Sequence, residues 1–106
     1  MTLKELSLRI ATWRDRKGFY TPSSLDSVEV RDAMLGKLML VVTEVAEAAE
    51  AVRHNDKENF EEEIADTFIR LLDICGTMRI DIERRIDEKM KVNEGRELRH
   101  GKKTTL

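Results

Sequence analysis

The stretch Lys37-Leu-Met-Leu-Val-Val-Thr-Glu-Val-Ala-Glu-Ala-Ala-Glu-Ala-Val52 decides the fold, because it is nearly all apolar and yet carries three glutamates. In a helix, residues three and four apart share a face. One such stripe holds Leu40, Glu44, Glu47 and Ala51. Two carboxylates therefore lie on a surface suited to burial, where an ionised carboxylate is costly unless it is paired or coordinated.

The rest of the chain repeats the helical pattern. Apolar residues at helical spacing predict helices over Leu3 to Lys17, Val28 to His54, Glu58 to Arg79 and Asp81 to Leu98. The segment Phe19 to Ser27 contains the only proline and is predicted to be a loop, and residues 98–106 are predicted to be a loose tail. No strand-like alternation is long enough to count, so the predicted class is all-α. With 106 residues, we expect a single domain spanning 1–106.

The two long helices should form an antiparallel hairpin, because only the short turn "HNDKEN" separates them. Asn55 or Asp56 can cap the second of these helices. The first, residues 28–54, is apolar around most of its circumference, which one partner helix cannot cover. We therefore expect a helical hairpin core with flanking helices, completed into a four-helix-bundle-type homo-oligomer. The sequence does not choose between a homodimer and a dimer-of-dimers tetramer.

Composition excludes several classes of protein. Charged residues make up 38% of the chain but nearly cancel to a net charge of −2, so we expect no stable nucleic-acid partner. The longest strongly apolar run, Leu38 to Val42, is too short to span a membrane. A single cysteine, Cys75, allows no internal disulfide and is expected in the core. Without a signal-peptide pattern, the expected location is the cytoplasm.

Two acidic pairs stand out. Glu44 and Glu47 lie on the first long helix and Glu63 and Asp66 on the second, so a hairpin brings all four to comparable heights. Convergent carboxylates repel one another without a cation, and their hard oxygens are the ligands that Mg²⁺ or Mn²⁺ prefers. A magnesium site that receives a phosphate is the simplest functional interpretation.

The alternative interpretation is structural. Arg70 follows Asp66 by four residues and could neutralise it in a salt bridge within the helix. The acidic stripes would then be interhelical salt bridges in a non-enzymatic helical oligomer or partner-binding module. Other chemistries lack their residues, since the sequence has no glycine-rich phosphate loop and no paired cysteines for zinc.

The segments "TEVAEAAEAV" and "FEEEIADTFIRLLDICG" resemble the MazG-type all-α nucleoside triphosphate pyrophosphohydrolases, whose pattern is ExxE on one helix and ExxD on the next. The similarity extends to "WRDRKGFYTP" and "KMKVNEGRELRHGKK". The resemblance implies Mg²⁺-dependent cleavage of a nucleotide between its α and β phosphates, giving the monophosphate and pyrophosphate. It makes Glu44, Glu47, Glu63 and Asp66 the metal ligands, with Glu44 and Glu47 also catalytic.

One departure concerns the general base. Many members of the family open the first motif with two adjacent glutamates, whereas Thr43 precedes Glu44 here. If that missing glutamate is the base in relatives, either Glu47 or the metal itself is left to activate the water.

The resemblance also assigns residues that bind substrate. Lys89, Asn93 and Arg96 occupy the positions of the family's Lys, Asn and Arg and are expected to hold the triphosphate, with Lys102 and His100 as weaker candidates. The alternative for this basic segment is a solvated helix end, where cations are also favourable.

Recognition of the base requires a planar apolar contact. Trp13, Phe19 and Tyr20 are the candidates, although a tryptophan at an amphipathic helical position is more often core. The family implies a role in removing unwanted nucleotides from the pool. A related enzyme acting on dUTP, dCTP or phosphoribosyl-ATP remains open, since nothing in the sequence selects the base or sugar.

Overall fold

The computed structural model describes residues 1–16 and 24–100, and the side chains of 1–13 and 24–96. These residues form four helices: α1 (Leu3–Arg16), α2 (Val28–Arg53), α3 (Lys57–Met78) and α4 (Ile82–His100). No strand occurs in the described ranges, which confirms the all-α class. None of the described helices combines the length and the apolar character needed to cross a bilayer.

Local side-chain chemistry sets the helix ends. Ser27 caps α2 by accepting from Val30 N, and Asp56 caps α3 by accepting from Asn59 N, as one of the two predicted caps. At the other end of α3, Arg79 adopts a left-handed conformation with φ of 53° and its N–H donates to Cys75 O. Residues 98–100, which were predicted to belong to a loose tail, lie within α4.

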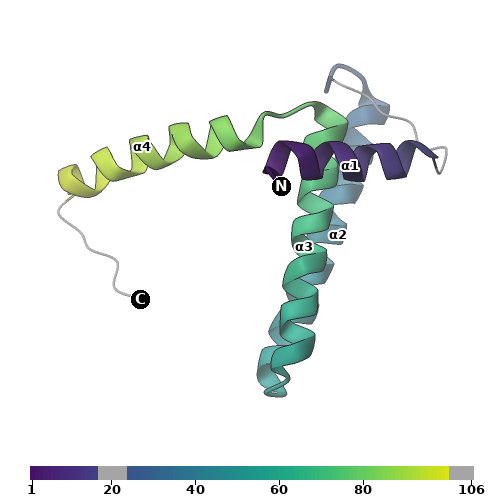
Figure 1. Cartoon of the computed structure of the whole chain (residues 1–106), viewed down its shortest axis with the longest axis vertical. Coiled ribbons are helices and arrows are strands. Elements are labelled where there is room, and N and C mark those ends of the chain that lie inside the picture. Colours follow the sequence, from purple (N-terminus) through teal and green to yellow (C-terminus); the bar gives the residue numbers. More distant parts are fainter. Residues whose placement is uncertain (17–23, 101–106) are drawn as a thin grey trace.

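Helices α2 and α3 form the predicted antiparallel hairpin (Figure 1). Helix α1 crosses the hairpin near its open end and packs on α3, while α4 turns away from the hairpin and meets only the α1 end of the molecule (Figure 1). The lower half of the hairpin, toward the 54–56 turn, is therefore covered by no other described helix.

The face that α2 presents to α3 is a regular stripe, which we call the inner stripe. Its members recur at alternating spacings of three and four: Met34, Lys37, Val41, Glu44, Ala48 and Ala51. The stripe predicted from the sequence does not coincide with the inner stripe. Of its four members, Glu44 and Ala51 are buried, whereas Leu40 and Glu47 are exposed. Alternating spacings of three and four allow two helices to keep one seam in contact over several turns.

A second stripe lies one residue, about 100°, further round α2 and is not covered by α3. This outer stripe consists of Leu35, Leu38, Val42, Val45, Ala49 and Val52, all exposed. Helix α3 also exposes apolar residues: Leu72 and Cys75 are buried, whereas Phe68 is 56% exposed. The radius of gyration, 16.6 Å, exceeds the roughly 13 Å of a compact domain of this length. One chain therefore does not bury its own apolar surface.

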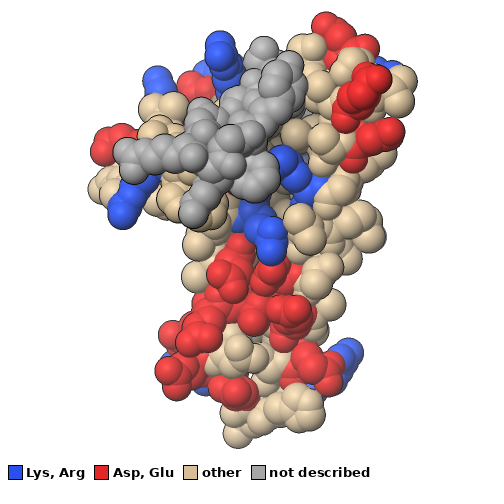
Figure 2. Space-filling model, turned by 90° about the vertical axis from the view of Figure 1, so that its right-hand side faces the viewer, with Lys and Arg blue, Asp and Glu red and all other residues tan. Residues whose placement is uncertain are grey.

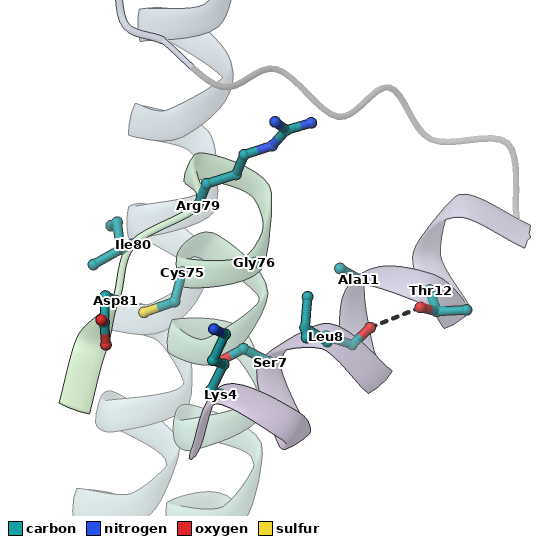
Figure 3. A pocket seen from close by; sticks show the side chains of 10 residues that line it. All are labelled: Lys4, Ser7, Leu8, Ala11, Thr12, Cys75, Gly76, Arg79, Ile80 and Asp81. Carbon is teal, nitrogen blue, oxygen red and sulfur yellow. Dashed lines mark hydrogen bonds between the residues drawn. The ribbon is translucent and has the colours of Figure 1, made fainter. Parts of the chain in front are cut away.

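A glycine permits the close crossing of α1 and α3. Gly76 of α3 lies against Ser7 and Ala11 of α1 where the two helices cross (Figure 3), and a Cβ built on it would lie 2.8 Å from Ser7 O and 3.0 Å from Ala11 Cβ. The nearer contact is backbone, which cannot swing aside. The small side chains at this crossing are thus a packing requirement.

We expect Gly76→Ala to lower the free energy of unfolding by about 1–3 kcal/mol, because the added methyl pushes α1 away from α3. Chemical denaturation monitored by circular dichroism measures this change. Gly36→Ala is the matched control, since no atom lies within 4 Å of its added Cβ and alanine favours the helix. Equal effects of the two substitutions would contradict the crossing geometry.

Candidate metal centre

The register of the hairpin brings the predicted carboxylates together. Lys37 of α2 pairs with Asp73 of α3. Glu44 lies seven residues after Lys37 and Asp66 seven residues before Asp73, so in an antiparallel hairpin these two carboxylates also come together. Carboxylate oxygens of Glu44, Glu63 and Asp66 all lie within 4.8 Å of one another. The exposed Glu47 lies close enough to Glu63 to share a hydrogen bond with it when one of the two is protonated.

Glu44 is compensated by an arginine from the facing helix. Glu44 is only 8% exposed, and its Oε1 accepts a hydrogen bond of 3.0 Å from Arg70 Nε. This hydrogen bond is the main reason that the pKa of Glu44 lies below its usual value. The alternative in which Arg70 neutralises Asp66 within α3 is not what the structure shows, because the guanidinium reaches across the hairpin to Glu44.

Glu63 is the carboxyl group that the protein leaves uncompensated. Its hydrogen bond with Glu44, its burial and its proximity to Glu47 together raise the pKa of Glu63 to about 7. Its Oε2 is buried and has no hydrogen-bond partner among the described residues. A buried, unpaired carboxylate oxygen is costly, so this atom needs either a proton or a cation.

These residues fit a divalent cation. Carboxylates converge on one face of the lower hairpin, where Asp and Glu side chains gather beneath a group of Lys and Arg (Figure 2). Hard oxygen ligands from Glu44, Glu63 and Asp66 are the donor type that Mg²⁺ and Mn²⁺ prefer. The salt-bridge alternative accounts for Glu44 but not for Glu63, whose neighbours are like-charged.

The other predicted residues lie elsewhere. Lys89, Asn93 and Arg96 are exposed on α4, which leaves the hairpin, so a single chain does not bring them to the acidic cluster (Figure 1). The exposed Thr43 donates to Met39 O along its own helix. Phe19, Tyr20 and Lys102, and the side chain of His100, lie outside the described residues.

Trp13 lies beside a feature that the sequence did not reveal. Residues of α1, α2 and α3 line an open cavity of about 650 Å³, and the 59% exposed Trp13 is one of them. Arg70 lines the cavity too, as does the Lys37–Asp73 pair. The one sequence feature that could have indicated this cavity is Lys37, a charged residue at an inner-stripe position two turns before Glu44.

Taken together, fold and site define a helical-hairpin protein with a carboxylate centre of the kind that binds a divalent metal. Residues 35–98 match the model of the MazG nucleotide pyrophosphohydrolase domain, which spans more than half of the chain. The chain therefore belongs to the MazG family, as the sequence motifs predicted. It matches none of the curated proteins and none of the solved structures with which it was compared.

The raised pKa of Glu63 predicts an unusual pH dependence of stability. With its pKa of about 7, Glu63 holds a proton in the folded state up to about pH 7, whereas the unfolded chain releases it near the ordinary pKa of a glutamate, 4.5. The folded protein thus binds more protons between these two values, so its stability should fall as pH rises through that window.

Thermal unfolding in chelator between pH 4.5 and 8 measures this dependence. The melting temperature should fall with rising pH in the wild type, and Glu63→Gln should remove that part of the slope. Mg²⁺ should oppose the fall, because a cation replaces the proton. A wild-type slope unaltered by Glu63→Gln would contradict the assignment.

Proposed function

We propose that this protein is a Mg²⁺-dependent nucleotide pyrophosphohydrolase that cleaves a ribo- or deoxyribonucleoside triphosphate between its α and β phosphates, releasing the monophosphate and pyrophosphate. The observation that carries the proposal is the convergence of Glu44, Glu63 and Asp66 across the hairpin, within the matched MazG span. A house-cleaning role in a cytoplasmic nucleotide pool follows from the family.

Each carboxylate has a distinct part. Glu44 is held in place and kept anionic by Arg70, so it is a fixed ligand. Glu63 and Asp66 supply the remaining ligand oxygens from α3. A Mg²⁺ held by these carboxylates would supply charge neutralisation for the phosphates and would polarise the phosphorus toward attack by water. Glu47, exposed beside Glu63, is our candidate for the base that accepts the proton of the attacking water.

The phosphate-binding residues require a second copy of the chain. Lys89, Asn93 and Arg96 recur at helical spacing on α4, and their charges suit a triphosphate. Since α4 leaves its own hairpin, we assign them to the acidic cluster of another copy. The outer stripe supports this assignment, because six small or apolar residues at coiled-coil spacing remain exposed in one chain.

Hydrolysis is tested with purified protein, a panel of common and modified triphosphates, and Mg²⁺ or chelator, with products separated by chromatography. We expect metal-dependent monophosphate and pyrophosphate, and kcat reduced by about 10²-fold or more in Glu47→Gln and Glu63→Gln. Glu50→Gln is the matched control, because Glu50 lies one turn beyond Glu47 on α2, is exposed and pairs with Arg53.

If no triphosphate is cleaved by the folded, magnesium-loaded protein, the enzymatic proposal is wrong. The non-enzymatic helical oligomer then accounts better for the interhelical ion pairs Glu44–Arg70 and Lys37–Asp73.

The assembly is tested on the outer stripe. Val42→Asp places a charge in the middle of that seam, so sedimentation should show a shift from an oligomer to a monomer, with hydrolysis reduced at least about tenfold. Leu25→Asp is the control, since Leu25 is similarly exposed but precedes α2. A wild-type monomer with full activity would rule out the second copy.

A further inference from the structure

Arg70 is the side chain that connects the acidic cluster with the open cavity. Its Nε donates to Glu44 Oε1 at 3.0 Å, and the same residue lines the cavity of about 650 Å³. Among the described residues, Nε is the only donor of this guanidinium that has a partner. Its two terminal amino groups, Nη1 and Nη2, therefore keep their N–H donors for a ligand.

The charged residues that line the cavity leave it with an excess of positive charge. Among its described lining residues, three cations face the single carboxylate of Asp73: Arg9, Lys37 and Arg70. Lys37 Nζ lies 2.6 Å from Asp73 Oδ2, so these two charges offset each other. Arg9 is exposed on α1 and makes no ion pair within the described part of the chain. Two guanidiniums with unused donors therefore remain on one cavity.

Unused guanidinium donors beside clustered carboxylates fit a phosphate chain. Mg²⁺ is usually held by one or two carboxylates together with phosphates of the substrate. Lys and Arg side chains gather directly above the carboxylates on this face of the hairpin (Figure 2). Because Arg70 touches Glu44, a phosphate that completes such a centre comes within reach of its Nη groups. A guanidinium is planar and always charged, and its forked N–H groups match the spacing of phosphate oxygens.

We propose that Arg70 is a phosphate-binding residue of the metal centre, with its Nη groups donating to the phosphate chain of the nucleotide while Nε stays on Glu44. Arg9 binds the same chain from α1. Both residues act in their own chain, in contrast to the cations of α4, which we assign to another copy. This inference rests on the proposed function for the identity of the ligand.

The competing role for Arg70 is purely structural, namely to hold Glu44 in position. The two roles differ in what they affect. Loss of a phosphate contact weakens the binding of phosphate, whereas loss of Glu44 positioning weakens the binding of the metal itself.

Arg70→Lys separates these roles, because the ammonium can still pair with Glu44 but lacks the guanidinium fork. Calorimetry on the full-length protein measures first Mg²⁺ alone and then pyrophosphate in excess Mg²⁺. We expect Mg²⁺ affinity to stay within about twofold and pyrophosphate affinity to fall about tenfold or more, because hydrogen bonds between charged groups are lost. Arg53→Lys is the matched control, since Arg53 also pairs with a glutamate, Glu50, and lines none of the cavity.

Arg9→Gln tests the second arginine in a variant that leaves the Glu44–Arg70 pair intact. It should weaken pyrophosphate binding by about two- to fivefold, less than Arg70→Lys, because an ion pair of an exposed side chain contributes less. An affinity equal to that of the wild type would overturn the role of Arg9.

The outcomes for Arg70→Lys separate this inference from the proposed function. Equal losses of Mg²⁺ and pyrophosphate affinity, unchanged pyrophosphate affinity, or no pyrophosphate binding by the wild type would overturn the phosphate contact even if triphosphates are hydrolysed. A selective loss of pyrophosphate affinity would uphold it. That loss, in a protein that hydrolyses no triphosphate, would uphold the arginine site and overturn the enzymatic proposal.

Discussion

The hydrogen-bonded ion pair between Glu44 and Arg70 is the interaction on which the rest of the hairpin depends. Glu44 is a carboxylate in the seam between two helices, where it is only 8% exposed, and Arg70 is the cation that makes this burial tolerable. The pair also determines the chemistry nearby. Because Arg70 serves Glu44, no cation is left within the hairpin for Glu63, and its pKa rises.

A second cross-helix pair, Lys37 with Asp73, lies two turns away in the same seam with the opposite polarity. The two pairs together tie the register of α2 and α3. Sliding one helix by a turn would leave both partly buried charges without partners, which costs more than either pair gains in water. The groups that fix the register also border the acidic cluster and the cavity, so folding and site assembly use the same contacts.

Within one chain, the hairpin pairs charged side chains across its seam but leaves much of its apolar surface exposed. The buried core is small, and three of the five core residues that α2 and α3 supply are alanine or cysteine. Among the described residues, the buried apolar set consists of Met34, Ala48, Ala51, Leu72 and Cys75 together with Ala11 of α1. The outer stripe and Phe68 remain exposed in one chain. An open core beside a regular exposed seam is the reason that the proposed site is built from more than one copy.

By itself, the sequence determined the helices, the hairpin and the four acidic candidates, because periodicity, caps and a short turn are local properties. It also carried the motifs that identified the family. Only the tertiary structure decided which neighbour each charge meets. By its spacing, Arg70 could have paired with Asp66 on its own helix. It instead reaches Glu44 across the seam, since the rotation of α2 and the hairpin register, not sequence distance, set that contact. The cavity with Lys37 and Asp73 likewise exists only where three helices meet, a relation that no spacing along one helix encodes.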